Sequence, residues 1–144
     1  MTLQRKGYIA RNTSLKPSGP IKRKKAKRKP PPTKTQLRRK CDILHGRIIR
    51  AQGYCSRCGR TQNLQRAHIF SRSYRAIEFD DRNCLCLDSA CHVYFTHHPV
   101  EWEIWVQERI GLETYYELRA KAMTHVVPDY RELLAELTAR CATL

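Results

Sequence analysis

The stretch NCLCLDSACH, residues 83–92, holds three cysteines, an aspartate, an asparagine and a histidine within ten positions. Thiolate, imidazole and carboxylate groups are the ligands that proteins use to bind zinc. A second cluster lies earlier in the chain, where YCSRCG places Cys55 and Cys58 at the C-x2-C spacing of a metal-binding turn. In a reducing compartment this spacing indicates zinc more often than disulfides, and the total of seven cysteines is odd. The two clusters together predict one structural zinc site that joins two separate segments.

Three ligands of this tetrahedral site are expected to be Cys55, Cys58 and Cys91. The fourth must come from the segment just before Cys91, where three side chains share one face if the segment is extended: Cys84, Cys86 and Asp88. Zinc favours thiolate ligands, so Cys86 is the preferred fourth ligand and Asp88 is the alternative.

Length and composition limit the class of protein. The 144 residues, 41% of them hydrophobic, suit one small domain whose core alone provides limited stability. No apolar run approaches the roughly 18 residues that cross a bilayer, and the N-terminus lacks the apolar core of a signal peptide. These features predict a soluble, cytoplasmic protein with no membrane partner, and we expect no small-molecule organic cofactor.

Positive charge is concentrated at the start of the chain. Residues 1–50 hold 17 Lys and Arg against one Asp, a net charge of +16, whereas residues 83–144 hold 5 basic and 9 acidic residues, a net charge of −4. DNA is the natural partner of such a segment, because each phosphate contact releases counterions from the nucleic acid. The run KRKKAKRK (22–29) supplies the expected contacts Lys24, Lys25 and Arg28. A solubilising tail or a nuclear address is the alternative interpretation.

The expected organisation is a disordered basic arm over residues 1–34 and one folded domain over residues 35–144. Prolines and repelling charges dominate KPSGPIKRKKAKRKPPPTK (16–34), which therefore cannot form a packed structure. Apolar residues then recur at helical spacing from about residue 35, ahead of Gly53, and a short strand is expected through Leu64–Ile69. Three further helices are expected over residues 100–110, 112–124 and 129–141, with Trp102 and Trp105 in the core. The predicted fold class is α+β.

His68, Asn83 and His92 occur in the order H, N, H, interleaved with the zinc-binding cysteines. In this order, and in the segments AHIFSR, FDDRN and CH, the chain resembles the HNH endonucleases, and more narrowly the phage NinG (Rap) type of recombination nuclease. The resemblance covers about residues 35–122. It implies a small zinc-stabilised ββα-metal domain with flanking helices, and a metal-dependent endonuclease that hydrolyses phosphodiester bonds during phage DNA recombination or processing.

The resemblance also implies a role for each motif residue. His68 would be the general base that takes a proton from the attacking water, since imidazole has a pKa near neutrality. His92 would bind a catalytic divalent cation, Mg²⁺ or Mn²⁺, and Asn83 would hydrogen-bond backbone groups across the loop. Arg72 and Arg75 lie in that loop and are assigned to phosphate binding.

One position departs from the family's pattern. Many HNH enzymes carry Asp or His just before the general base, where it shares the catalytic metal, but this chain has Ala67. The cation would then depend on His92, water, phosphate oxygens and one further side chain from the set His97, His98 and Asp81. The departure favours a second hypothesis, a catalytically inactive zinc-stabilised module for DNA binding or recombination. A structural zinc protein that binds RNA is a third. Oligomeric state and preferred DNA structure stay open.

Overall fold

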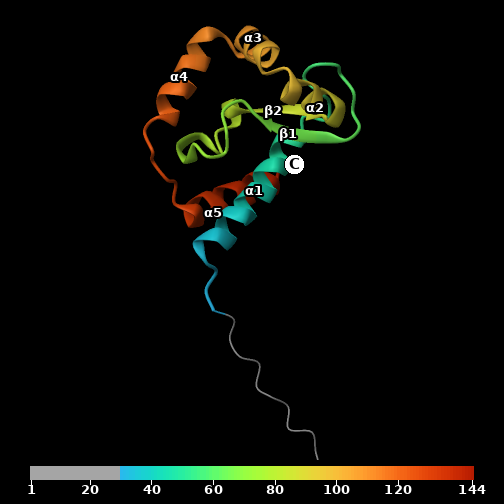
Figure 1. The fold of residues 1–144 in the computed structure, drawn as a ribbon. Helices are drawn as coiled ribbons and strands as arrows, with labels where there is room; N and C mark the ends of the chain where they lie inside the picture. Colours follow the sequence, from blue (N-terminus) through green and yellow to red (C-terminus); the bar gives the residue numbers. More distant parts are fainter. Residues whose placement is uncertain (1–29) are drawn as a thin grey trace, which may run out of the picture. The chain divides into compact units, whose positions relative to one another are not determined.

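The computed structural model describes residues 30–144, and its regular elements bear out the α+β class (Figure 1). The described part has five α-helices, two strands and two short 3-10 turns, in the order α1 (Lys34–Arg50), β1 (Leu64–His68), η1 (Arg75–Ile77), η2 (Asp81–Asn83), β2 (Cys84–Asp88), α2 (Ser89–His97), α3 (Pro99–Ile110), α4 (Leu112–Ala122) and α5 (Tyr130–Cys141). A compact unit begins at Pro31. Most of the predicted arm, including Lys24, Lys25 and Arg28, lies outside the described residues. No helix within residues 30–144 is long and apolar enough to cross a membrane.

The strands β1 and β2 form an antiparallel pair that ends directly in a helix. The register places Leu64 opposite Asp88 and His68 opposite Cys84. Asp88 is the N-cap of α2, so no loop separates β2 from the helix. The result is a strand–strand–helix unit that carries His68 and His92, and Asn83 lies immediately before β2.

The core of this unit is small and partly aromatic. Ala67, Leu87 and Phe95 form a buried cluster together with two of the cysteines. Both tryptophans of α3 pack against this cluster, with ring centroids 5.0 Å from that of Phe95. The predicted packing role of Trp102 and Trp105 is therefore confirmed.

The two outer helices α1 and α5 pack side by side (Figure 1), although they lie at opposite ends of the described chain. Their contact is made by the buried residues Leu37, Cys41, Tyr130 and Leu137. Thr33 and Gln36 form a reciprocal capping box at the start of α1, which satisfies backbone groups that a helix N-terminus leaves unpaired. Helix α4 covers the loop between β1 and β2 by packing on Ile77.

Candidate functional site

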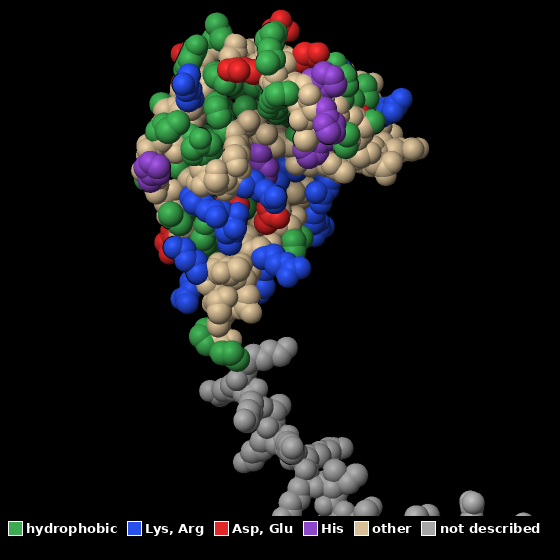
Figure 2. Space-filling model, viewed as in Figure 1, with side chains coloured by type: hydrophobic (Ala, Val, Ile, Leu, Met, Phe, Trp, Pro, Cys, Tyr) green, Lys and Arg blue, Asp and Glu red, His purple; other side chains and the backbone are tan. Residues whose placement is uncertain are grey.

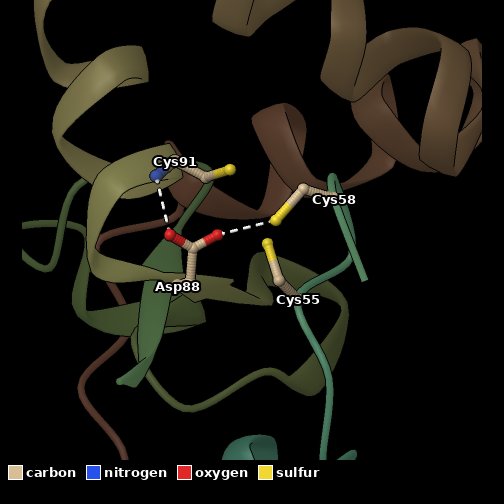
Figure 3. A group of neighbouring side chains, drawn as sticks. All are labelled: Cys55, Cys58, Asp88 and Cys91. Atoms are coloured by element: carbon tan, nitrogen blue, oxygen red, sulfur yellow. Dashed lines mark hydrogen bonds between the residues drawn. The ribbon is translucent and has the colours of Figure 1, made fainter. Parts of the chain in front are cut away.

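Four side chains from three segments converge on one point (Figure 3). Cys55 and Cys58 come from the turn after α1, Asp88 from the end of β2, and Cys91 from the first turn of α2. One ligand atom from each lies within 4.8 Å of all the others, and this is the one such group of metal-ligating side chains within residues 30–144. The group could hold a metal ion.

The turn that carries Cys55 and Cys58 is held by backbone hydrogen bonds. Within it, Gly59 N–H donates to the Cys55 carbonyl at 2.9 Å, and Cys55 N–H donates to the Arg60 carbonyl at 2.7 Å. Gly59 has a φ of +77°, a conformation that side chains other than glycine rarely adopt. Ser56 N–H donates to the Cys86 carbonyl at 2.8 Å, which fixes the turn against β2.

Asp88 has two roles in this geometry. Its Oδ1 accepts hydrogen bonds from the backbone N–H groups of Ala90 and Cys91 at 2.9 and 3.2 Å, which caps α2. Its Oδ2 accepts from the Cys58 thiol at 2.9 Å (Figure 3). Hydrogen bonds from the thiols of Cys58 and Cys91 hold the pKa of the Asp88 carboxyl far below its usual range. The carboxylate is thus ionised and available to a cation at neutral pH.

The preference for Cys86 as the fourth ligand is corrected by this geometry, because the structure brings Asp88 to the group and leaves Cys86 out. Cys86 is fully buried in the middle of β2, and burial raises the pKa of its thiol. A strand advances about 3.3 Å per residue, so Cys86 lies about 6.6 Å back from the end of β2, where α2 begins. Asp88 joins the group because it lies at the end of β2, although zinc binds thiolate more tightly than carboxylate.

The geometry suits a tetrahedral ion. In a zinc site with bonds of about 2.3 Å to sulfur, neighbouring ligand atoms lie about 3.8 Å apart. The four atoms here lie within 4.8 Å, so a small inward movement would close them on one ion. Burial raises the pKa of the Cys91 thiol to about 12, so the metal-free group keeps that proton and binding would release it.

A positive charge lies directly beside the group. The guanidinium carbon of Arg57 lies 4.0 Å from the ring centroid of Tyr94 and 4.6 Å from that of Phe95. Its Nη1 lies 4.0 Å from Cys91 Sγ. Three thiolates and a carboxylate around a divalent ion carry two excess negative charges, which this cation partly offsets.

The second site is a cavity of about 160 Å³ beside the sheet. His68 and His92, the outer two residues of the H, N, H series, both line it. The other lining residues are Ala67, Phe95, Thr96 and Trp102. His68 ends β1 and His92 lies in the first turn of α2, so the strand–strand–helix unit brings the two histidines to one cavity.

The protonation state of His68 follows from its hydrogen bond. Its Nε2 lies 3.2 Å from the Glu78 carbonyl oxygen. A carbonyl only accepts hydrogen bonds, so Nε2 carries the proton and Nδ1 keeps its lone pair. Burial and then the charge of Arg66 lower the pKa of His68 to about 4, which keeps the ring neutral at pH 7.

His92 is oriented by a residue that the sequence did not single out. Its Nδ1 lies 2.7 Å from Gln65 Oε1 on β1. Because the amide oxygen only accepts, Nδ1 carries the proton and Nε2 is left as a potential ligand or base.

Asn83 is fully buried and bonds only to the loop between the strands. Its Oδ1 accepts from Phe70 N–H at 2.8 Å, and its Nδ2 donates to the carbonyls of Phe70 and Ile77 at 3.2 and 3.0 Å. Its own carbonyl accepts from Ile69 N–H at 2.8 Å. Asn83 thus fixes the backbone that follows His68.

Glu78 is another residue that sequence reasoning missed, since an acidic side chain in a loop usually lies in solvent. It is fully buried and pairs with Arg38 and Arg75. Arg75, assigned from sequence to phosphate binding, is therefore also an ion-pair partner, whereas Arg72 is exposed.

Two of the further metal ligands considered from sequence, Asp81 and His98, have other partners. Asp81 binds His45 and Arg140, while His98 stacks on Tyr94 at 4.2 Å between ring centroids. Within residues 30–144, His92 belongs to no group of three metal-ligating side chains.

No protein-family model, curated protein or solved structure matches the chain. The metal-ligand group and the cavity are therefore the features of the molecule that bear on its function.

Proposed function

We propose that this protein is a metal-dependent DNA endonuclease of the HNH type, stabilised by a zinc ion at Cys55, Cys58, Asp88 and Cys91. The observation that carries the proposal is the cavity shared by His68 and His92, because it unites two imidazoles from opposite ends of one strand–strand–helix unit. The buried hydrogen bonds of Asn83, which hold the loop between them, support the same assignment.

Zinc is the metal that the ligand group suits best. Three sulfur ligands select zinc over magnesium or calcium, which prefer oxygen. Four protein ligands leave no open position, as is typical of a structural zinc site. Elemental analysis of the purified protein should therefore find one zinc per chain, and a folded, monodisperse sample without zinc would refute the assignment.

His68 has the properties of a general base. Its Nδ1 has a free lone pair, its ring is neutral, and it lines the cavity. In the proposed reaction Nδ1 takes the proton from a water molecule as that water attacks the scissile phosphate. The hydrogen bond from Nε2 to the Glu78 carbonyl keeps the ring oriented while the charge develops.

His92 is the proposed protein ligand of a catalytic Mg²⁺ or Mn²⁺ ion, through Nε2. Gln65 holds the other ring nitrogen, which fixes the tautomer as in other metal-binding histidines. When bound, such a cation would neutralise charge on the phosphate and on the leaving oxygen. A site with one protein ligand keeps several waters and binds weakly before substrate arrives, as magnesium sites often do.

One observation favours the alternative of an inactive DNA-binding module. Ala67 lines the cavity with a methyl group, where many HNH enzymes present a second metal ligand. Under this alternative the zinc and the positive charge would serve binding alone.

Cleavage of supercoiled plasmid DNA separates the two hypotheses. The full chain is incubated with plasmid in the presence of Mg²⁺ or Mn²⁺, and nicked and linear products are expected. His68→Asn should abolish cleavage with DNA affinity nearly unchanged, since a base acts in the transition state more than in ground-state binding.

The matched control is His125→Asn, which removes an exposed histidine that lies outside the cavity. Residue 125 has a φ of +55°, a conformation that asparagine tolerates. Cleavage by the control and not by His68→Asn supports the proposal. Absence of cleavage in every protein, with DNA binding retained, would favour the inactive module.

A further inference from the structure

The buried carboxylate of Glu78 holds two arginines in fixed orientations. Arg38 donates to it from Nε at 3.0 Å and from Nη2 at 2.6 Å, and Arg75 donates from Nη1 at 3.0 Å. Glu78 is fully buried, whereas the side chains of Arg38 and Arg75 are 34% and 35% exposed. Two cations therefore share one anion, and the trio carries a net positive charge at the surface.

Both guanidinium groups keep donors for another ligand. Among the described hydrogen bonds, none uses Nη1 of Arg38 or Nη2 of Arg75. A guanidinium that is already oriented by a carboxylate loses little conformational entropy when it binds a second anion. The arrangement is thus preorganised for an oxyanion.

A pocket of about 270 Å³ lies between these groups at the start of α1. Its lining contains the three cationic side chains Lys34, Arg38 and Arg75 and no carboxylate. The remaining lining residues are Thr35, Val127 and Tyr130. Lys34 Nζ lies 5.9 Å from the ring centroid of Tyr130, which holds the ammonium group at the pocket. On the face shown in Figure 2, Lys and Arg side chains gather below the histidines at its centre.

We propose that this pocket binds a phosphate group of a DNA backbone at a position separate from the scissile phosphate. The choice of DNA as the source of the phosphate rests on the proposed function; the pocket's fit to a phosphate group does not. Glu78 connects the two sites, because its carboxylate orients the arginines and its carbonyl accepts from His68. One residue thus orients both the proposed general base and the two arginines of the pocket.

The first test measures DNA binding without cleavage, in the full chain carrying His68→Asn and with no added divalent cation. Lys34→Gln should reduce the magnitude of the negative slope of log affinity against log salt concentration by about 0.9, the value of one phosphate contact. Lys40→Gln is the matched control, since Lys40 is exposed on the same helix and does not line the pocket. Equal effects of the two substitutions would overturn the proposal.

The second test uses inorganic phosphate, followed by NMR. Saturable shifts are expected at the amides of Thr35 and Arg75 and not at Lys40, and Arg75→Lys should weaken them because an ammonium group lacks the planar fork. Phosphate binding without a selective effect of Lys34→Gln on DNA would assign the pocket to a free anion and overturn the DNA source. A selective effect of Lys34→Gln on DNA binding without binding of inorganic phosphate supports the DNA backbone as the ligand. If neither effect is seen, the proposed phosphate-binding pocket is refuted. Because no readout depends on cleavage, a protein that fails to cut plasmid can still pass both tests.

Discussion

His68 should titrate far below an ordinary histidine. Burial and the charges of Arg66 and Arg72 lower the pKa of its ring to about 4, against about 6.5 in an unfolded chain. Between these values the unfolded chain binds a proton that the folded protein does not, so acidification through this range destabilises the fold. The base form persists above pH 4. An NMR titration of the ring should give a midpoint near 4, and Arg72→Gln should raise it.

A midpoint near 6.5 would mean that the ring is solvated and that its bond to Glu78 is absent in solution.

Asp88 allows its two roles to be separated by substitution. Asp88→Asn keeps an oxygen that can cap α2 but removes the carboxylate. Zinc affinity should fall by more than roughly tenfold, because loss of a residue that only orients a metal ligand already costs about that much. Asp88→Ala also loses the cap, which should lower the free energy of unfolding by about 1 kcal/mol more. Competition with a chelating dye and urea unfolding in excess zinc measure the two effects. Unchanged zinc affinity in Asp88→Asn would return Cys86 to the ligand set.

Individual side chains differ in how well the sequence predicted them. Of the three motif residues, His68 and His92 line one cavity, whereas Asn83 bonds to the loop between the strands. The choice between Cys86 and Asp88 was not decided by ligand chemistry, since it depends on where β2 ends. The burial of Glu78 was not predicted, because one of its two partners, Arg38, lies on α1, far away in the sequence.

The buried amide of Asn83 makes three of the hydrogen bonds that hold the loop between β1 and β2. Asn83→Ala removes three side-chain hydrogen bonds and leaves the backbone N–H and carbonyl of Phe70 without these partners inside the loop. At about 1 kcal/mol for each bond, the free energy of unfolding should fall by about 3 kcal/mol. Urea denaturation measures this loss, and Gln62→Ala, an exposed position, is the control. Surface substitutions usually change the free energy of unfolding by less than about 0.5 kcal/mol. A loss as small as that in Asn83→Ala would show that other contacts hold the loop.

The helices were easier to predict than their partners. Gly111 and Pro128 separate the last three helices, and the predicted ranges lie close to α3, α4 and α5. The periodicity of α1 indicated an apolar face, but not that α5 would cover it. Sequence patterns report which face is buried, whereas the partner depends on chain topology.

The charge of the whole chain should act mainly through its first 29 residues. They hold 11 of the 28 Lys and Arg and no acidic residue, so deleting them leaves 17 basic and 13 acidic residues, a net charge of +4. The truncated protein keeps the Thr33 cap and all four side chains of the proposed zinc site. Its zinc content should be unchanged, while its DNA affinity and the salt dependence of that affinity should both fall, because fewer counterions are released.

Binding measured at several salt concentrations tests this expectation. A full-length variant with the same 11 residues changed to Gln separates charge from length. An unchanged salt slope in both proteins would transfer the DNA contact to the folded domain.

The pairing of α1 with α5 has a consequence for biosynthesis. All four side chains of the proposed zinc site lie within residues 55–91, so that part could acquire an ion while later helices are still being made. The apolar face of α1 must wait for residues 130–141. At about 5–20 residues per second, translation leaves this face uncovered for several seconds, during which it is open to chaperones. We expect ribosome-stalled chains that end before Tyr130 to be cleaved by protease within α1, and completed chains to resist.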